Sequence, residues 1–258
     1  MTFIHHHRPE VPSTNQWAMD WLKDELPSRP VLFTADHQSA GKGQRERLWH
    51  SERGQDVAMS LVLPARTHWT PASLNKRVAL SVRSTLLNML PQGQSDRAVL
   101  VKWPNDILVW HGAGHFKVAG ILLENVWRGS TWSHAIVGVG LNVRSRRLTQ
   151  SYRAISLSEA WQAELAPNDL AKQLAMNLVS DLNQSFDGLS EAYGKALFAR
   201  GECRPYLVNR ERVQGTLLSV DDQGRGHFNW EVTQDAAPNP SNRLASSDVT
   251  WCWPRHDA

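Results

Sequence analysis

The chain has 258 residues and a formal net charge of only +3, which by itself is too small to indicate nucleic-acid binding. Its two cysteines, Cys203 and Cys252, lack the spacing of metal ligands, which argues against a zinc site or a disulfide framework. No uncharged apolar run approaches about 20 residues and no apolar signal sequence opens the chain, so we expect a cytoplasmic protein without a membrane span.

The N-terminal part is expected to hold a tail, one helix and two strands. The tail carries three histidines at residues 5–7 and is predicted to be solvated, as polar termini usually are. Capping side chains at residues 13–15 precede a helical pattern that should run until Pro27 stops it. Strands are predicted at 31–36 and 57–63, on either side of a glycine-rich, charged loop.

The middle of the chain alternates helical and strand patterns. Thr70 and Pro71 fit the cap and first position of a long amphipathic helix, because leucines and valines recur every four residues from Leu74 to Leu90. Short apolar stretches at 99–103, 107–110, 117–126 and 134–143 predict neighbouring strands, several of them antiparallel. A second long helix is expected after a cap at Asn168.

The last 55 or so residues have a different pattern, with short strands only. A turn at Asp221–Gly224 between two apolar runs predicts a hairpin, and residues 248–253 predict one more strand. We expect a small β-barrel here, with a main domain at 1–200 and a second domain at 201–258.

One loop carries Gly41 and Gly43 together with Lys42, Arg45 and Arg47. Glycines let backbone N–H groups approach a ligand, and guanidinium groups suit phosphate. The loop has neither the P-loop pattern nor the third glycine of a dinucleotide fingerprint. Taken alone, it fits a solvated basic loop better than an anion clamp.

Residues 102–106 read K-W-P-N-D and place polar side chains between two runs that favour strands. Because a buried unpaired charge is costly, these groups lie either at a turn or around a charged ligand. Pro104 with Asn105 and Asp106 is typical of a tight turn. Lys117 begins the next apolar run, and its simplest interpretation is a lysine at a strand edge with its charge in solvent.

Gly138 and Gly140 lie inside a further apolar run. Glycine weakens a strand, so it marks either a bulge or the close approach of a ligand or another segment. The sequence leaves both interpretations open.

Taken in order, these segments resemble those of biotin–protein ligases. The chain carries S-T-N-Q from Ser13, H-Q-S-A-G-K-G-Q-R-E-R-L-W from His37, K-W-P-N-D from Lys102, K-V-A-G-I-L-L-E from Lys117 and G-V-G-L-N-V from Gly138. The resemblance covers about residues 12–143 motif by motif, and the C-terminal part more loosely. It implies an α+β fold: a mixed β-sheet flanked by helices, as in class II synthetases, with a small C-terminal SH3-like barrel.

The resemblance implies a two-step reaction that uses ATP, biotin and Mg²⁺. Biotin would react with ATP to give biotinyl-5′-adenylate and pyrophosphate, and a lysine of the biotin carboxyl carrier protein of acetyl-CoA carboxylase would then accept the biotinyl group. About a dozen residues precede S-T-N-Q, so the N-terminal DNA-binding domain of some relatives is expected to be absent and no operator binding is expected. An exposed sheet edge could pair two subunits.

The resemblance also implies roles for individual residues. Catalysis would depend on Lys117, Asp106 and Arg45, and Asp106 would also help to hold Mg²⁺ and to deprotonate the incoming lysine. Biotin would contact Ser13, Thr14, Gln38, Gly41, Trp49, Lys117, Gly120 and Gly138. ATP and the adenylate would contact Lys42, Arg45, Arg47, Lys102, Asn105 and Asn142.

Two loop residues depart from the commonest pattern of the family, which has arginine where this chain has Gln44 and glycine where it has Glu46. We expect a weaker hold on the adenylate than the common loop gives. Two other functions stay open: a lipoate–protein ligase with the same adenylate chemistry, and a basic nucleic-acid-binding module without enzymatic activity.

Overall fold

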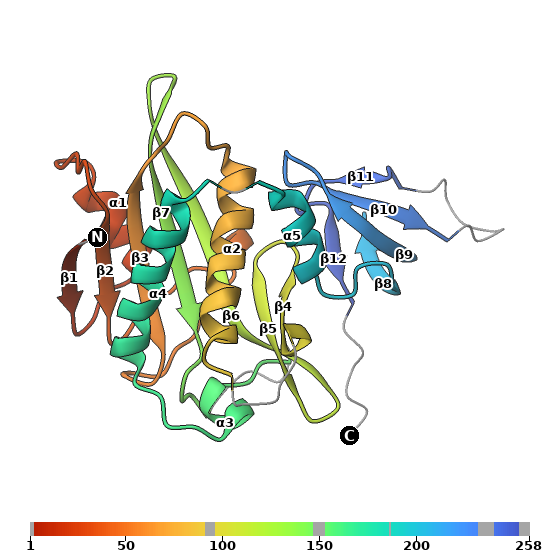
Figure 1. The fold of residues 1–258 in the computed structure, drawn as a ribbon, viewed down its shortest axis with the longest axis horizontal. Helices are drawn as coiled ribbons and strands as arrows, with labels where there is room; N and C mark the ends of the chain where they lie inside the picture. Colours follow the sequence, from red (N-terminus) through yellow and green to blue (C-terminus); the bar gives the residue numbers. More distant parts are fainter. Residues whose placement is uncertain (1–2, 91–95, 147–152, 186, 232–239, 253–258) are drawn as a thin grey trace.

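The fold is described from a computed structural model, which describes residues 3–90, 96–146, 153–185, 187–231 and 240–252. A mixed seven-stranded sheet carries helices on its faces, and a five-stranded antiparallel sheet lies beside it at the C-terminal end (Figure 1). The predicted fold class is therefore confirmed. The predicted domain boundary at residue 201 falls just before the first strand of the smaller sheet and stays a prediction.

The seven-stranded sheet has the order β1-β2-β3-β7-β6-β5-β4. β1 runs parallel to β2, and every other neighbouring pair is antiparallel. The strands are β1 (Ile4–Arg8), β2 (Val31–Ala35), β3 (Val57–Pro64), β4 (Val99–Lys102), β5 (Asp106–His111), β6 (Gly114–Arg128) and β7 (Thr131–Leu141).

The histidine segment is a strand, so the prediction of a solvated tail was wrong. β1 pairs with β2 in register from Ile4 opposite Val31. His5 and His7 point to one face and contact the Thr34 hydroxyl at 2.8 and 3.0 Å, whereas His6 points to the other face and stacks on Phe33. Imidazole rings have an apolar body and a polar tip, which suits both faces of an edge strand.

The helices follow the sequence pattern except at two ends. α2 (Pro71–Leu87) begins as predicted, with a capping box between Thr70 and Ser73. α1 (Thr14–Trp21) ends earlier than predicted, well before Pro27: the chain continues in single turns, and Leu26 is exposed. The other helices are α3 (Leu157–Trp161), α4 (Pro167–Asn183) and α5 (Leu189–Ala196), with short 3₁₀ turns η1 (Gln44–Glu46) and η2 (Asp96–Ala98). Asn168 is not the cap of α4: Pro167 starts that helix, because its fixed φ and missing N–H suit the first position.

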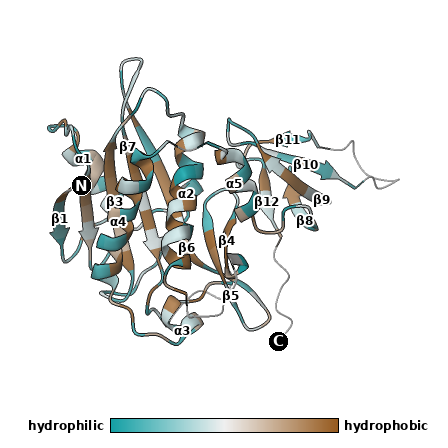
Figure 2. Ribbon diagram, in the orientation of Figure 1, coloured by the Kyte–Doolittle hydropathy of each residue, from teal (hydrophilic) through white to brown (hydrophobic). Residues whose placement is uncertain are grey.

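Apolar side chains from α2 and α4 cover one face of the seven-stranded sheet. Leu74, Val78, Val82 and Leu86 of α2 are all fully buried, and α4 supplies a matching row at the same four-residue spacing. Each such side chain contributes roughly 1.5–3 kcal/mol when it leaves water. Figure 2 shows the central strands as hydrophobic ribbons with α2 and α4 lying across them. In the described residues, no helix is both long and apolar enough to cross a membrane.

The C-terminal sheet has the order β11-β10-β9-β8-β12 and its own aromatic core. The predicted hairpin is confirmed: β9 and β10 meet at a turn in which Asp221 accepts hydrogen bonds from the backbone N–H groups of Gln223 and Arg225. Tyr206, Phe228 and Trp230 pack together, with 4.6 Å between the stacked rings of Phe228 and Trp230. Its strands are β8 (Cys203–Val208), β9 (Glu211–Val220), β10 (Gly226–Trp230), β11 (Arg243–Leu244) and β12 (Val249–Trp251).

Candidate active site

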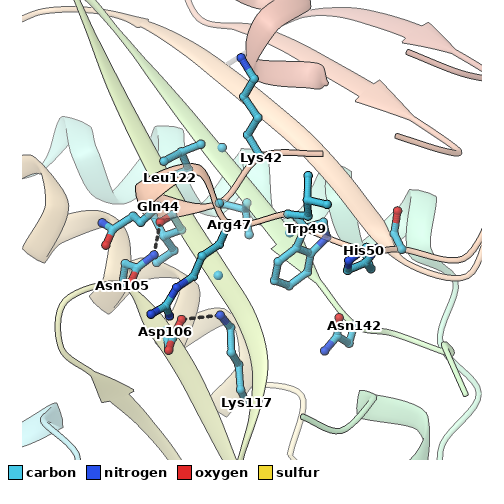
Figure 3. Close-up of a pocket in the computed structure, with 18 of the residues that line it drawn as sticks. Lys42, Gln44, Arg47, Trp49, His50, Asn105, Asp106, Lys117, Leu122 and Asn142 are labelled. Atoms are coloured by element: carbon cyan, nitrogen blue, oxygen red, sulfur yellow. Dashed lines mark hydrogen bonds and ion pairs between the residues drawn. The ribbon is translucent and has the colours of Figure 1, made fainter. Parts of the chain in front are cut away.

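A cavity of about 370 Å³ lies where the two sheets meet. The seven-stranded unit lines it with the start of α1, the loop after β2, Met59 of β3, the turn between β4 and β5, β6, the end of β7 and residues that follow β7. The C-terminal sheet lines it with β12. Figure 3 shows labelled side chains from the loop after β2, the turn between β4 and β5, β6 and the residue after β7 around one space. Segments more than 200 residues apart in sequence thus form a single site.

One end of the cavity, the neutral end, consists of Ser13, Thr14, Asn15 and Gln38. The Thr14 N–H and hydroxyl both donate to Gln38 Oε1, at 2.8 and 3.1 Å. Ser60 reaches this group from β3, with its hydroxyl 2.8 Å from Thr14 Oγ1 and 2.5 Å from Asn15 Oδ1. Gln38 is half-buried and the other polar side chains of this group are buried. They hold one another in place, so the neutral end is preorganised for an uncharged polar ligand.

The opposite end, the charged end, consists of Lys102, Asp106 and Lys117. Asp106 lies between two ammonium groups, with 3.0 Å from its Oδ2 to Lys102 Nζ and 2.6 Å from its Oδ1 to Lys117 Nζ. Strand register explains the arrangement, because Lys102 in β4 is paired with Asp106 in β5, and Asp106 with Gly120 in β6. Backbone bonds to Arg153 and Ile155 fix Lys117 from the other side.

The charged end carries a net positive charge. Burial alone would raise the pKa of the Asp106 carboxyl, but the two ammonium groups outweigh it and hold that pKa at about 2. Asp106 is therefore ionised at neutral pH, and one of the two lysine charges is left over. That surplus suits an anionic ligand.

The Trp49 indole lies between the two ends. Gly120 and Gly140 are directly paired on β6 and β7, and a Cβ at Gly140 would collide with the indole. A Cβ at Gly120 would come within 3.1 Å of the same ring. The two glycines of β7 mark the close approach of other segments and not a bulge. Asn15 packs over Gly138 and Trp49 packs over Gly140, and the pairing of β7 with β3 keeps its register at both positions.

The indole N–H of Trp49 is buried and, among the described residues, has no hydrogen-bond partner. A buried donor without a partner is costly, and its position inside the cavity indicates that a ligand would satisfy it. The Lys117 ammonium lies 5.6 Å from the centre of the same ring.

The basic loop closes on itself over the cavity. Gly43 N–H donates to Arg47 O at 2.7 Å and Trp49 N–H donates to Gly41 O at 2.8 Å, with η1 at the tip. Gly41 does not line the cavity; a Cβ there would lie 2.5 Å from Trp49 O, so its small size allows the loop to close. Arg45 adopts a left-handed φ of 57°, which a non-glycine residue occupies at a cost.

The cations of the loop point in different directions. In Figure 3, Arg47 points toward the end that holds Asp106 and Lys117, whereas Lys42 points away from it. The Lys42 ammonium lies 3.3 Å from Gln16 Oε1, on the exposed side of α1. Arg45 donates to the backbone carbonyl of Val249 in β12 at 3.4 Å.

The remaining sequence-predicted residues also line the cavity. Asn105 donates from its side chain to Ile121 O at 2.8 Å, which ties the turn between β4 and β5 to β6. Asn142 is buried at the end of β7, with its backbone N–H on Val118 O. The sequence has a second cluster of arginines at residues 144, 146 and 147. Arg144 and Arg146 do not line the cavity, and Arg147 lies outside the described residues.

Sequence reasoning missed three groups of residues at the site. Asn15 directly follows two predicted site residues and could have been found from its place in S-T-N-Q. Asp56 had no such signal. It is buried behind the cavity lining and accepts hydrogen bonds from the Val143 N–H and the Ser145 hydroxyl, which ties the loop to the segment after β7. Burial raises the pKa of its carboxyl. No sequence signal placed β12 at the site either, yet all three of its residues line the cavity.

Comparisons with known proteins identify the family of this chain. The model of the biotin/lipoate A/B protein ligase family matches residues 9–142. The chain is 28% identical over 227 residues to the bifunctional ligase/repressor BirA of Escherichia coli, and it spans 66% of that protein's length while 84% of this chain is covered. It is 27% identical over 204 residues to the biotin–[acetyl-CoA-carboxylase] ligase of Mycobacterium tuberculosis, covering 76% of this chain and 71% of that one.

Solved structures share the whole fold. The biotin protein ligase of Aquifex aeolicus, determined with biotin and ATP, superimposes with a TM-score of 0.68 at 21% identity, covering 98% of this chain and 96% of that one. The Leishmania major enzyme, determined with biotinyl-5-AMP, gives a TM-score of 0.64 at 21% identity, with 95% and 100% covered. At this identity the likeness establishes the fold, including the smaller C-terminal sheet.

Proposed function

This chain belongs to the biotin/lipoate A/B protein ligase family, and we propose that it is an ATP-dependent biotin–protein ligase. In the first step a biotin carboxylate oxygen bonds to the α-phosphorus of ATP and pyrophosphate leaves, which gives biotinyl-5′-adenylate. In the second step the amine of a carrier lysine attacks the acyl carbon, loses a proton, and releases AMP as the amide forms. The carrier we propose is the biotin carboxyl carrier protein of acetyl-CoA carboxylase.

The observation that supports this function best is the joining of a neutral end and a charged end in one cavity. Biotin has an uncharged ureido ring at one end, an apolar chain, and a carboxylate at the other. We assign the ring to Ser13, Thr14 and Gln38, and the chain to the slot formed by Trp49, Gly120 and Gly138. The carboxylate then meets the Lys117 ammonium.

The nucleotide is assigned to the charged end and to the loop above it. Lys102 and Lys117 together offset the repulsion between the biotin carboxylate and the α-phosphate, which is the main electrostatic cost of the first step. Arg47 already points there (Figure 3), and Arg45 at the tip of the loop reaches the Val249 carbonyl in β12, another wall of the cavity. Asn105 and Asn142 border the space left for the nucleoside.

Two assignments from the sequence need changes in their detail. Gly41 contributes by letting the loop close rather than by touching biotin. Lys42 lies on the far side of the loop, so its contact with ATP requires the loop to turn inward when the substrates bind.

Asp106 suits a different role from proton removal. A carboxylate with a pKa of about 2 is a weak base toward a lysine ammonium, whose ordinary pKa is near 10.4. We assign Asp106 to holding its two lysines at a fixed separation.

A protein-held Mg²⁺ site does not fit the residues present. Each oxygen of Asp106 is already within 3.0 Å of an ammonium group, and the described residues contain no cluster of three or more metal-ligating side chains. Mg²⁺ prefers phosphate oxygens and water with one or two carboxylates. We therefore treat Mg²⁺ as part of the ATP substrate and give it no site on Asp106.

The test is exchange of labelled pyrophosphate into ATP by the purified chain, with biotin, lipoate or neither. We expect exchange that depends on biotin. Exchange with lipoate alone would assign the chain to the lipoate branch of the family, and absence of exchange together with binding to DNA or RNA would support the nucleic-acid-binding alternative.

A further inference from the structure

β12 belongs to the C-terminal sheet, yet it forms one wall of the candidate active site. Nothing in the roles proposed above uses its side chains. The most extensive contacts in this strand are those of Trp251, which touches both sheets.

Trp251 is fixed from two sides. Its indole N–H donates to the backbone carbonyl of Trp103 at 2.9 Å, in the turn that leads to Asp106. Its ring packs on Tyr206 of the C-terminal sheet, with 4.9 Å between centroids, and on Phe198 at 5.9 Å. A ring held this way has little freedom to move away from the cavity.

Trp103 makes the opposite connection. Its own indole N–H donates to the backbone carbonyl of Gly224, in the hairpin turn of the C-terminal sheet, at 3.1 Å. Each tryptophan therefore donates to a backbone carbonyl of the other sheet's unit. Two such bonds in opposite directions join the C-terminal sheet to the turn that carries the charged end.

The Trp251 ring also contacts the charged end directly. The Lys102 ammonium lies 5.6 Å from the ring centre and 3.0 Å from Asp106 Oδ2. Only 9% of the Lys102 side chain is exposed, so its attraction to the ring is little weakened by water. The ring and the carboxylate both contribute to holding this ammonium in place.

We propose that Trp251 is a positioning residue of the ATP-activating step: it holds the Lys102 ammonium against Asp106, and through it the C-terminal sheet takes part in nucleotide activation. The proposal rests on the function proposed above. It predicts that Trp251 affects the use of ATP more than the use of biotin, because the biotin ring lies at the neutral end.

Substitutions at Trp251 test this in pyrophosphate exchange. In Trp251→Leu we expect the KM for ATP to rise about tenfold while the KM for biotin changes less than twofold. Trp251→Phe keeps a ring over Lys102 but loses the N–H, and should stay within about threefold of the original chain. Trp127→Leu is the matched control, since Trp127 is 55% exposed, stacks on Trp132 and does not line the cavity. Equal changes in both KM values, or none, would overturn the proposal.

A double substitution tests whether Trp251 acts through Lys102. In the Lys102→Ala background, Trp251→Leu should cause no further change in the KM for ATP, because the group it positions is gone. Effects that simply multiply would mean that Trp251 acts independently, and would contradict the proposal.

Amine labelling followed by mass spectrometry gives a readout that does not depend on the reaction. The labelling rate of Lys102 should rise at least about fivefold in Trp251→Leu, with Lys195 unchanged as the internal reference and Trp127→Leu unchanged as the control. An unaltered Lys102 rate would overturn the positioning role even if the chain proved to have another activity. Failure of biotin-dependent exchange in the original chain would instead reject the proposed function.

Discussion

Uncharged side chains bonded to one another form the neutral end of the cavity, whereas at the charged end a single carboxylate separates two ammonium groups. Thr14 and Gln38 are hydrogen-bonded to each other without a ligand. Replacing one of these side chains therefore removes one hydrogen bond of modest energy. At the charged end, removing Asp106 leaves two partly buried ammonium groups without their counter-charge, and removing either lysine abolishes the surplus positive charge. The two ends should therefore respond to substitution on different scales.

Lys117→Ala should have the largest effect. It removes the ammonium assigned to the biotin carboxylate and α-phosphate, so biotin-dependent pyrophosphate exchange should fall at least about 100-fold in kcat. Lys195→Ala removes a surface lysine that pairs with Glu191, and should leave the rate unchanged. Normal exchange by the Lys117 variant would mean that the charged end has been assigned wrongly.

Asp106→Asn should lower stability in a way that depends on pH. The folded-state pKa of about 2 lies below the ordinary value near 3.9, so this carboxylate stabilises the fold above about pH 4, and the contribution is lost as the pH falls through 2. The shift corresponds to about 2.5 kcal/mol. The difference in unfolding free energy between the original chain and the variant should thus shrink by about that amount between pH 5 and pH 2.

Urea unfolding at several pH values measures this difference. Asp20→Asn is the matched control, because Asp20 forms an exposed pair with Lys23 one helical turn away, and such pairs contribute little. A difference for Asp106→Asn that stays constant from pH 5 to pH 2 would show that Asp106 is not held ionised by its two lysines.

Thr14→Val should have a smaller effect, confined to biotin. It removes a hydroxyl bonded to Gln38 while keeping the shape of the side chain, so the KM for biotin should rise about fivefold with kcat within about twofold. Thr85→Val removes a buried hydroxyl from α2, outside the cavity, and should change neither constant. A rise in the KM for ATP alone would contradict the assignment of Thr14 to biotin.

Gln44→Arg should have the smallest effect. Gln44 lines the cavity, and arginine there would add a positive charge near the adenylate, so release of labelled biotinyl-5′-adenylate should slow about threefold. Gln173→Arg, on the exposed side of α4, is the control for added charge. Unchanged or faster release would contradict the expectation that the present loop holds the adenylate weakly. Glu46 is the other departure from the common loop, and its side chain is not described in the structure.

Sequence periodicity predicted the parts of the fold that depend on local burial. The four-residue spacing from Leu74 to Leu86 gave α2, and the turn at Asp221–Gly224 gave the β9–β10 hairpin. β1 was missed because its three histidines were interpreted as part of a polar tail. In the structure this segment pairs with β2 along its whole length. Pairing across strands, which decides such cases, is not encoded within the strand itself.

The same contrast holds for the cavity. The order of the motifs predicted that Lys102, Asp106 and Lys117 lie in one site. The structure brings them together because they lie on consecutive strands. The contributions of Asp56 and β12 depend on contacts between segments 87 and about 150 residues apart, and no spacing rule links them. The direction of Lys42 also follows from the closed shape of the loop rather than from its sequence.

The most direct test of the account is a crystal structure of this chain with biotin and a non-hydrolysable ATP analogue. We predict the ureido ring within hydrogen-bond distance of Thr14 or Gln38, and the carboxylate within about 3 Å of Lys117 Nζ, facing the α-phosphate. Biotin bound in the reverse direction, or outside the cavity between the two ends, would contradict the account.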